Sequence, residues 1–379
     1  MTELKREFVG ITDRALDDLR KRIGVRIEDT LEPWCYESTR DNIRHYAHGI
    51  GDDNPLWCDP AYGKTTPYGD VLAPPSFLFS CSRIVSGYVG GMPGVHAMFA
   101  GCDFTWHKPI PRNIEISTSA YLKDLVEHQT RFAGRSIQQI YHVDFFNPSG
   151  DLLAAADTWC FRTDRDIARE EGTKYKETNA RAPKVYTNED LAKIYKLYEN
   201  EEVRGATPRY WEDVKVGDKL PPMVKGPMTV TGFIAYVQGW GGLYVRSHKL
   251  AWKFIQKHPG AGIKNRFGIP DCPERVHWEP EFALRVGAPG AYDYGPERCS
   301  WMSHYITNWI GDAGLLHKLY CEVRRHNPEG DTIFIEGSVT GKSEKDGKKL
   351  IDFEIVAKNQ EGDLSAKATA SAILPSRGR

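Results

Sequence analysis

Apolar and polar positions follow one another in an order that occurs twice along the chain. In the first half, a polar start at residues 37–39 leads into an amphipathic segment, and an apolar segment at helical spacing, residues 77–88, follows a pair of prolines. In the second half, residues 229–237 and 301–310 repeat these two patterns, and residues 301–310 are apolar on nearly every side. This spacing predicts an amphipathic helix and a buried helix in each half.

Each half ends in two strand-like runs that flank a hairpin signal. The signal is Asn-Pro-Ser-Gly at residues 147–150 in the first half and Asn-Gln-Glu-Gly at residues 359–362 in the second. Asparagine and glycine at such positions favour tight turns between strands. A buried helix followed by antiparallel hairpins, present in two copies, predicts an α+β fold made from a duplicated domain. The runs are residues 139–146, 152–162, 350–358 and 364–374.

A charged stretch, residues 163–205, separates the two halves. Within it, Asn188 has the character of an N-cap and precedes apolar residues at helical spacing, which predicts a surface helix. We therefore expect an N-terminal domain at residues 1–162 and a C-terminal domain at residues 206–379, with an insertion in the latter at about residues 242–272.

The composition narrows the class of protein. The 379 residues are 40% hydrophobic and 27% charged, and the net charge of -1 lacks the basic excess that a nucleic-acid surface requires. There is neither a signal-peptide pattern nor a run of about 18 apolar residues, the length that spans a membrane. The eight cysteines are scattered, the histidines lack metal-ligand spacing, and no nucleotide-binding glycine motif occurs. We expect a cytoplasmic protein with no metal, no other cofactor, and no nucleic-acid or membrane partner.

Residues 51–57 form the first motif with chemical content. They read Gly-Asp-Asp-Asn-Pro-Leu-Trp and resemble the hydratase motif of MaoC-like acyl-CoA dehydratases, Gly-Asp-x-Asn-Pro-Leu followed by His. Asp52 stands at the position of the family's aspartate. Trp57, which cannot transfer a proton, stands near that of its histidine. Asp52 and Asn54 would then form only an Asx-type turn, beside a pocket for the acyl tail.

Residues 277–295 resemble the closing half of the same motif. His277 stands at the position of the family's histidine, and the stretch ends in Gly295, just before the buried helix. At the position of the aspartate, five residues before His277, the chain has Cys272. The carboxylates that could replace the aspartate are Asp271, Glu274 and Asp293.

The resemblance implies a fold, an activity and a set of site residues. The fold is a double hot-dog, in which two antiparallel sheets each wrap a long central helix. The activity is similar to that of R-specific enoyl-CoA hydratases and 3-hydroxyacyl-CoA dehydratases, which transfer protons and stabilise the thioester oxygen with backbone N–H groups. The implied residues are His277, Asp271, Asp293 and Asp52 for proton transfer, Gly295, Asn54, Tyr292 and Trp57 at the thioester, and Lys108, Arg112 and Arg298 at the CoA phosphates.

His277 is the favoured general acid and base in this interpretation. His304 and Asn308, on the buried helix, are interpreted as buried, hydrogen-bonded side chains rather than as catalytic ones. Ten tryptophans suggest a roomy aromatic pocket for a bulky or cyclic acyl group of an acyl-CoA substrate, as in the catabolism of fatty acids or of aromatic or steroid compounds. Packing in the core is the alternative role of these tryptophans, and it is the favoured one.

Two other functions also fit the sequence. Neither half has the complete motif, and a carboxylate and a histidine from different halves are not expected to meet at one substrate unless the insertion supplies another carboxylate. The chain could therefore be a non-catalytic acyl-CoA-binding or partner subunit. It could also be a hot-dog thioesterase in which Asp52 or Asp293 drives attack of water on the thioester. The identity of the acyl group, the half that holds the working site and the oligomeric state stay open.

Overall fold

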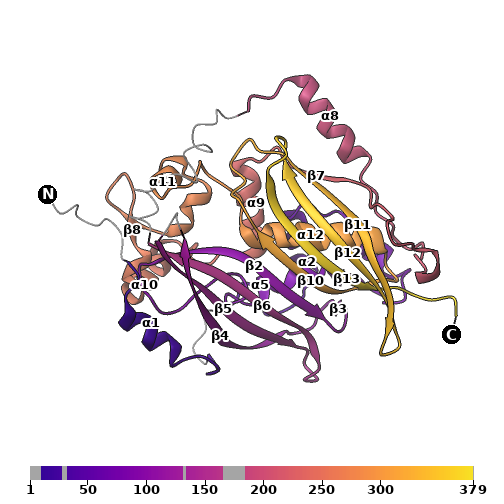
Figure 1. Cartoon of the computed structure of the whole chain (residues 1–379), viewed down its shortest axis with the longest axis horizontal. Helices are drawn as coiled ribbons and strands as arrows, with labels where there is room; N and C mark the ends of the chain where they lie inside the picture. Colours follow the sequence, from indigo (N-terminus) through magenta and orange to yellow (C-terminus); the bar gives the residue numbers. More distant parts are fainter. Residues whose placement is uncertain (1–9, 28–31, 131–133, 165–183, 379) are drawn as a thin grey trace.

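A computed structural model of the chain describes residues 10–27, 32–130, 134–164 and 184–378. Within them, nine strands form one antiparallel sheet, which covers one side of the molecule, and helices lie against its inner face (Figure 1). The strand order is β4-β5-β6-β2-β10-β13-β12-β11-β7. The strands are β2 (His96–Trp106), β4 (Ser117–Thr130), β5 (Gly134–Phe146), β6 (Leu152–Thr163), β7 (Met223–Lys225), β10 (Leu315–Val323), β11 (Ile333–Lys345), β12 (Lys348–Asn359) and β13 (Leu364–Ile373).

The two halves of the chain meet where β2 pairs with β10. Cys102 lies opposite Cys321 in this antiparallel register, and both side chains are buried. The sheet is therefore continuous across the boundary between the halves, and the predicted α+β class is confirmed.

The two hairpin turns have the same local structure, as expected for a duplication. In the first, the side-chain oxygen of Asn147 accepts from the backbone N–H groups of Ser149 at 3.0 Å and Asp151 at 2.9 Å. In the second, Asn359 accepts in the same way from residues 361 and 363, at 3.1 and 2.9 Å. An asparagine that satisfies two turn N–H groups fixes the hairpin, and with it the register of the following strand.

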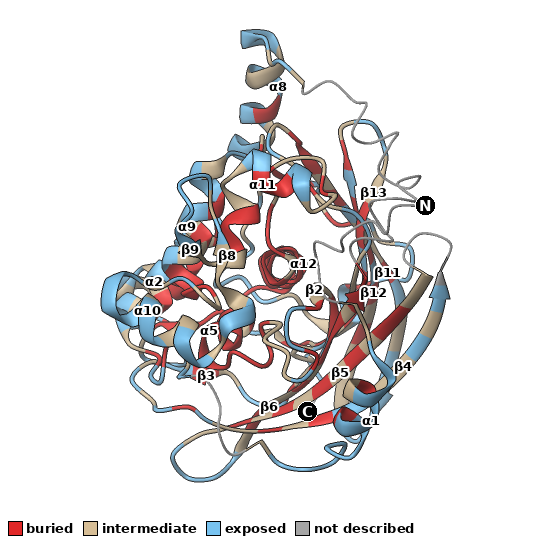
Figure 2. Cartoon of the chain, turned by 90° about the vertical axis from the view of Figure 1, so that its left-hand side faces the viewer, coloured by how far each residue is buried: buried red, intermediate tan, exposed pale blue. Residues whose placement is uncertain are grey.

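The helix α12 (Gly295–Ile310) occupies the centre of the molecule. Figure 2 shows it end-on, with buried residues around its whole circumference and the sheet beside it. The predicted amphipathic helices are α2 (Arg40–Gly49) and α9 (Val230–Trp240), and both begin after an N-capping threonine. These two helices pack closely against each other, because a Cβ on Gly239 would lie 2.4 Å from the carbonyl oxygen of His45.

The first half lacks the long central helix expected at residues 77–88, and this part of the prediction needs correction. The segment forms only η1 (Pro75–Phe77) and α5 (Leu78–Cys81), and Ser82 has an extended backbone, with φ -152° and ψ 132°. The hydroxyls of Ser80 and Ser86 donate to backbone carbonyls of the same segment. Serines that compete with the backbone in this way favour turns over a continued helix.

The charged stretch between the halves contains α8 (Asn188–Glu199), which packs beside the edge strand β7. Its N-cap is Thr187 rather than Asn188, because the Thr187 hydroxyl accepts from Asp190 N–H and the Asp190 carboxylate accepts in return. After α8, the chain runs back along α12, where the backbone N–H of Arg204 donates to the carbonyl of Asn308 at 2.9 Å. This return brings the connecting segment against the central helix.

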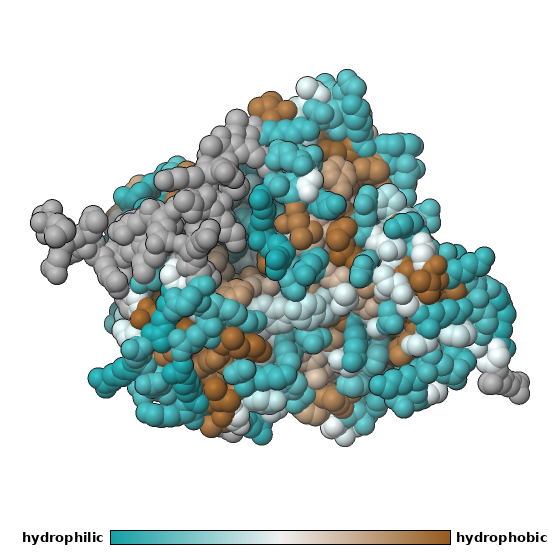
Figure 3. Space-filling model, viewed as in Figure 1, coloured by the Kyte–Doolittle hydropathy of each residue, from teal (hydrophilic) through white to brown (hydrophobic). Residues whose placement is uncertain are grey.

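The outer face of the sheet, which faces the viewer in Figure 3, is mostly hydrophilic, with hydrophobic residues in separate groups. No helix among the described residues is long and apolar enough to cross a membrane. The elements not yet described are short and lie around the sheet and α12 (Figure 1). They are α1 (Asp13–Arg20), α3 (Pro55–Cys58), α4 (Pro60–Gly63), β1 (Leu72–Ala73), β3 (Ile110–Pro111), η2 (Trp211–Asp213), α10 (His248–Lys257), η3 (Pro259–Ala261), β8 (Ile263–Lys264), β9 (Pro270–Asp271), η4 (Pro273–His277) and α11 (Pro280–Arg285).

Candidate active site

The loop after α2 holds the Asp52 carboxylate in a buried position. One Asp52 oxygen accepts from the backbone N–H of Asn54 at 3.0 Å, and the other accepts from the indole N–H of Trp57 at 3.0 Å. Asn54 in turn caps α3 by accepting from the N–H of Leu56 at 3.0 Å. The predicted Asx-type turn is therefore present, and Trp57 takes part in it by binding the carboxylate.

The imidazole of His304, on α12, faces this carboxylate. His304 Nε2 lies 3.4 Å from Asp52 Oδ1, and both side chains are fully buried. A carboxylate of the first half and an imidazole of the second half are therefore in contact, although the histidine is His304 and not the predicted His277. The physical reason is that α12 also fills the centre of the first half, where the chain's own helix ends at Cys81.

A second carboxylate reaches His304 from the segment that joins the halves. Glu201 Oε1 lies 3.2 Å from His304 Nε2 and accepts from the Asn308 amide at 3.0 Å. Burial acts to raise the pKa of Glu201, but the hydrogen bond to His304 and the charge of Lys225 outweigh it and hold the pKa below its usual value. Glu201 is therefore ionised at neutral pH.

Lys225, at the end of β7, lies on the other side of the imidazole. Its ammonium contacts three acceptors, namely the carbonyls of Gly51 at 2.9 Å and Ile50 at 3.3 Å and His304 Nδ1 at 3.0 Å. A protonated lysine has three N–H donors, so each of them has an acceptor here. His304 Nδ1 then accepts a hydrogen bond, and Nε2 carries the ring proton and points towards the carboxylates. The amide nitrogen of Asn308 also lies 3.0 Å from Nε2. Because both groups are donors in this tautomer, they do not bond to each other.

We call Asp52, His304, Asn308, Glu201 and Lys225 the inter-half site. It contains a carboxylate–imidazole pair that can accept and supply protons, which is the chemistry of general acid–base catalysis. Within the described residues, no group of three metal-binding side chains occurs.

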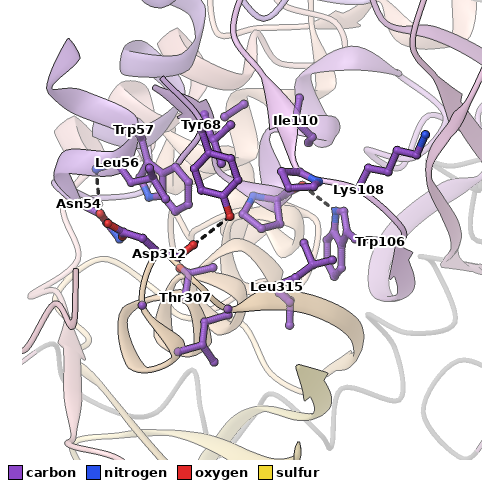
Figure 4. Close-up of a pocket in the computed structure, with 18 residues that line it drawn as sticks. Asn54, Leu56, Trp57, Tyr68, Trp106, Lys108, Ile110, Thr307, Asp312 and Leu315 are labelled. Carbon is purple, nitrogen blue, oxygen red and sulfur yellow. Dashed lines mark hydrogen bonds between the residues drawn. The ribbon is translucent and has the colours of Figure 1, made fainter. Parts of the chain in front are cut away.

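A narrow apolar cavity of about 40 Å³ adjoins the inter-half site on one side. Asn54 and Trp57 belong to its wall, together with Thr307 of α12 (Figure 4). Tyr68 closes one edge by donating to the carbonyl of Asp312 at 2.9 Å. Lys108 lies at the rim with its ammonium pointing away, and it pairs with Asp151 at 2.8 Å. The other lining residues include Leu56, Leu72, Ala73, Trp106, Ile110, Ile310, Leu315 and Leu316.

A groove of about 450 Å³ adjoins the inter-half site on the other side. Glu201 and Asn308 line it directly, so the polar site has a face towards this larger space. The connecting segment forms one wall of the groove and α12 forms another. The remaining lining residues include Val203, Arg204, Thr207, Arg209, Leu220, Pro221, Pro222, Met223, Tyr305 and Trp309.

The structure places His277 in a different environment from the one expected of a general base. Its Nδ1–H donates to the carbonyl of Tyr292 at 2.6 Å, and its ring stacks on Tyr294 with 3.6 Å between centroids. Burial lowers the pKa of His277 to about 3, so the imidazole is neutral at physiological pH. Asp271 lies in the β8–β9 hairpin, where it accepts from Asn265 at 3.2 Å. No described contact joins Asp271 to His277.

Asp293, predicted for proton transfer, and Arg298, predicted at the CoA phosphates, form a buried ion pair with each other. Arg298 Nε lies 2.6 Å from one Asp293 oxygen, and the Asn327 amide donates to the same oxygen at 2.8 Å. Burial raises the pKa of Asp293, although the charge of Arg298 opposes this. Arg298 is only 2% exposed, so it has no face free for a CoA phosphate, and Asp293 has no oxygen free for a substrate.

Two further predicted residues have packing or pairing partners of their own. A Cβ on Gly295 would lie 2.5 Å from the ring of Phe99 in β2, so a glycine is required for the close approach of α12 to this strand. Arg112 binds Asp70 through contacts of 3.1 and 3.2 Å near the molecular surface. The roles of Gly295 at the thioester and of Lys108 and Arg112 at CoA stay predictions.

Glu274 lies in η4, just after the insertion, and binds the first residues of the insertion. Its carboxylate accepts from the N–H of Leu243 at 2.7 Å and from that of Tyr244. Burial raises its pKa. Glu274 therefore holds the start of the insertion, and no described contact links it to His277.

Sequence reasoning missed two members of the inter-half site. Lys225 carried a signal, because it interrupts an apolar run, Met-Val-Lys, that precedes the helix of the second half. Glu201 carried none, because it lies among other glutamates in a charged stretch. His304 and Asn308 are buried and hydrogen-bonded, as predicted. The same interpretation set them apart from the catalytic candidates and did not predict that His304 faces Asp52.

Sequence comparisons match part of the chain. A family model described as "FAS1-like, dehydratase domain region" matches residues 22–139. A UPF0336 protein of Streptomyces avermitilis is 43% identical over 54 residues, 14% of this chain and 36% of the relative. One from Thermobifida fusca is 53% identical over 45 residues, 12% of this chain and 30% of the relative. The chain thus matches about a third of the length of these two relatives. A third UPF0336 protein, from Parafrankia, is 28% identical over 31% of this chain and 79% of its own length.

Comparisons of structure extend over the whole chain. A protein described as a MaoC-like dehydratase aligns with a TM-score of 0.66 and 18% identity, covering 94% of this chain and all of its own. A MaoC domain protein dehydratase from Chloroflexus aurantiacus has a TM-score of 0.58 and 12% identity and covers both chains fully. A Mycobacterium tuberculosis protein described as a double hot-dog has a TM-score of 0.56 and 10% identity, covering 95% of this chain and 98% of its own. The predicted double hot-dog fold is confirmed, but its two predicted sheets are joined into one, and a single long helix, α12, lies at the centre.

Proposed function

We propose that this chain, which belongs with the MaoC-like dehydratases, adds or removes water at the 2,3-position of a bulky enoyl-CoA thioester, with Asp52 and His304 as its acid–base pair. The dehydratase-region match and the double hot-dog fold support hydratase or dehydratase activity in general terms. The observation that carries the proposal is the approach of Asp52 Oδ1 to His304 Nε2, at 3.4 Å, beside a groove large enough for a substrate.

The two side chains suit the two proton transfers of hydration. The Asp52 carboxylate accepts a proton from water while the water oxygen bonds to C3, and the Nε2–H of His304 supplies the proton that bonds to C2. In dehydration, both transfers run backwards. The carboxylate and the imidazole are already held by hydrogen bonds, so little reorganisation is needed when a substrate arrives.

The thioester oxygen needs a donor close to this pair. With a rise of about 1.5 Å per residue, Gly295 lies roughly 13 Å from His304 along α12, too far to serve the same thioester. The amide of Asn308 lies one helical turn from His304 and lines the groove. One of its two N–H groups donates to Glu201, and the other has no acceptor when His304 Nε2 is protonated. We therefore assign the stabilisation of the thioester oxygen to this second N–H of Asn308.

The groove favours a bulky acyl thioester. Its volume of about 450 Å³ is within the range of ligand sites, roughly 300–1,000 Å³. Leu220, Met223 and Trp309 offer apolar contact to an acyl or pantetheine chain. The narrow cavity beyond Trp57, at about 40 Å³, has room only for a small group or a water.

The test is the loss of enoyl-thioester absorbance with short, long and cyclic enoyl-CoA substrates. We expect Asp52→Asn and His304→Gln to lower kcat by about 100-fold or more, the usual size of a lost acid–base contribution. His277→Gln is the matched control, because it makes the same change outside the inter-half site. Loss of hydration with His277→Gln and not with His304→Gln would contradict the proposal and favour the site first expected from the sequence.

One observation favours a non-catalytic acyl-CoA-binding role as the second candidate. Both Asp52 oxygens already accept from Asn54 and Trp57, as expected of a residue that only supports the loop. In that case an enoyl-CoA would bind, as measured by calorimetry, and would be recovered unchanged. Release of free CoA during the same incubation would instead identify a thioesterase.

A further inference from the structure

We infer that Lys225 is the proton source behind His304, and that it acts through the imidazole rather than on the substrate. The inference rests on the proposed function, because it concerns how His304, the acid of that site, is supplied with a proton. Its basis is the contact of 3.0 Å between Lys225 Nζ and His304 Nδ1, on the ring edge opposite the carboxylates.

The tautomer of His304 creates the need for such a group. Since Lys225 donates to Nδ1, the neutral imidazole carries its one proton on Nε2. When Nε2–H passes to C2 of the substrate, the ring would become an anion unless Nδ1 gained a proton at the same time. Lys225 is the described donor on Nδ1, so its transfer of a proton keeps the imidazole neutral.

The cycle closes without another proton donor. In hydration, the oxygen of water bonds to C3 and one of its protons passes to Asp52, while Nε2–H passes to C2 and a lysine N–H passes to Nδ1. Asp52, now protonated, lies 3.4 Å from the free Nε2 and returns its proton there. Nδ1–H then returns to the lysine amine, which restores the starting state. The sum is the addition of one water across the double bond.

The environment of Lys225 suits a lysine that gives up its proton. The side chain is buried, and burial lowers its pKa, although the negative charges of Glu201 and Asp52 oppose this. The charged and titratable groups that face it are His304 and Glu297 on α12, Asp52 and Asp53 on the loop, and Glu201 on the connecting segment. A lowered pKa brings a lysine closer to the range in which it exchanges protons at neutral pH.

The same lysine also positions the site. Its other two N–H groups donate to the carbonyls of Ile50 and Gly51, immediately before Asp52. Lys225 therefore ties the Asp52 loop of the first half to His304 of the second. If Lys225 had only a structural role, its bonds to these two carbonyls would be enough for it. The experiments below therefore separate a structural role of Lys225 from proton supply.

The first measurement uses the unchanged protein. Nitrogen-15 NMR of histidine-labelled protein reports which ring nitrogen of His304 carries the proton, with His304→Gln identifying the signal. We expect protonated Nε2 and unprotonated Nδ1 at neutral pH, and a change of this pattern in Lys225→Met. Protonated Nδ1 in the unchanged protein would overturn the inference, whatever the activity.

The second measurement is the pH profile of hydration in Lys225→Met, which keeps much of the side-chain length without a proton to give. We expect kcat to fall about 100-fold, the size of a lost acid, with KM little changed and with loss of the limb that reports the acid. The exposed Lys219→Met is the control. Addition of methylamine to Lys225→Ala should restore part of kcat, which checks that the variant is folded.

The outcomes separate this inference from the proposed function. Full kcat in Lys225→Met, together with loss in Asp52→Asn and His304→Gln, would overturn proton supply by Lys225 and leave the proposed function standing. Full hydration in Asp52→Asn and His304→Gln would overturn the proposed function. The tautomer of His304 would still show whether Lys225 donates to Nδ1.

Discussion

Trp57 shows how a single side chain can replace another without breaking a motif. It stands near the position of a histidine in the related motif, yet its indole N–H binds the Asp52 carboxylate at 3.0 Å. The tryptophan therefore keeps a donor on the carboxylate while removing a group that could transfer a proton. The imidazole that faces Asp52 comes from elsewhere in the chain, from His304 on α12, and in the proposed function this residue transfers the proton.

Substitution of Trp57 tests how much the hydrogen bond from its indole N–H to the Asp52 carboxylate contributes to stability. We expect Trp57→Phe to lower the free energy of unfolding by about 1–3 kcal/mol, because a buried carboxylate oxygen loses its partner. Urea unfolding followed by circular dichroism gives this value. Trp106→Phe is a matched control, since the Trp106 indole donates at 3.0 Å to a neutral carbonyl, and its effect should be smaller. Equal losses in the two variants would contradict a charged Asp52.

The neutral state of His277 makes stability depend on pH. Its folded pKa of about 3 lies below its ordinary value, so the unfolded chain binds a proton that the folded chain does not as pH falls below about 6.5. Stability should therefore decrease from pH 7 to pH 5, with a contribution from His277 of about 2 kcal/mol. Urea unfolding of the protein and of His277→Gln at both pH values tests this. A pH dependence unchanged by His277→Gln would disprove it.

The ion pair of Asp293 and Arg298 should matter for folding rather than for chemistry. We expect Asp293→Asn to cost about 3–5 kcal/mol of unfolding free energy, because it leaves a buried guanidinium without its counter-charge. Thermal unfolding measures the loss, and kcat per folded molecule should stay close to that of the unchanged protein. A selective loss of kcat with normal stability would return Asp293 to the list of catalytic candidates.

At the scale of elements, the close approach of α12 to β2 is what brings the halves together. This contact depends on the absence of a side chain at Gly295, where a Cβ would lie 2.5 Å from Phe99. We expect Gly295→Ala to destabilise the protein by about 1–3 kcal/mol through overpacking. The double variant Gly295→Ala, Phe99→Leu should recover part of the loss, as measured by urea unfolding. No recovery would show that backbone conformation, not packing, sets the requirement.

The elements that the sequence predicts correctly are those with local signals. The hairpins at Asn147 and Asn359 and the helix after Thr229 depend on residues a few positions apart, and all of them are present. The segment at residues 77–88 has helical spacing, but its three serines, Ser80, Ser82 and Ser86, bond to nearby backbone groups. Periodicity does not detect that competition. The meeting of Asp52 with His304 joins residues far apart in the chain, and only the path of α12 produces it.

At the scale of the whole molecule, the continuous sheet and the single central helix make the halves dependent on each other. We expect one cooperative unfolding transition in calorimetry, with equal calorimetric and van't Hoff enthalpies, despite the length of 379 residues. Two resolved transitions would show that the halves are separate folding units. The pairing of β2 with β10 and the burial of α12 on all sides are the physical reasons for one transition.

The contact of α12 with the Asp52 loop of the first half also has a consequence for how the sequence varies among relatives. In a homodimer of simple hot-dogs, each copy would hold its own pair, and a change in one position would be present in every subunit. Here the carboxylate and the imidazole descend from different copies of the duplicated segment, so selection acts on them separately but on their contact jointly. Among relatives with this architecture, positions 52, 225 and 304 should therefore vary together, and a chain that loses the histidine should also lose the lysine.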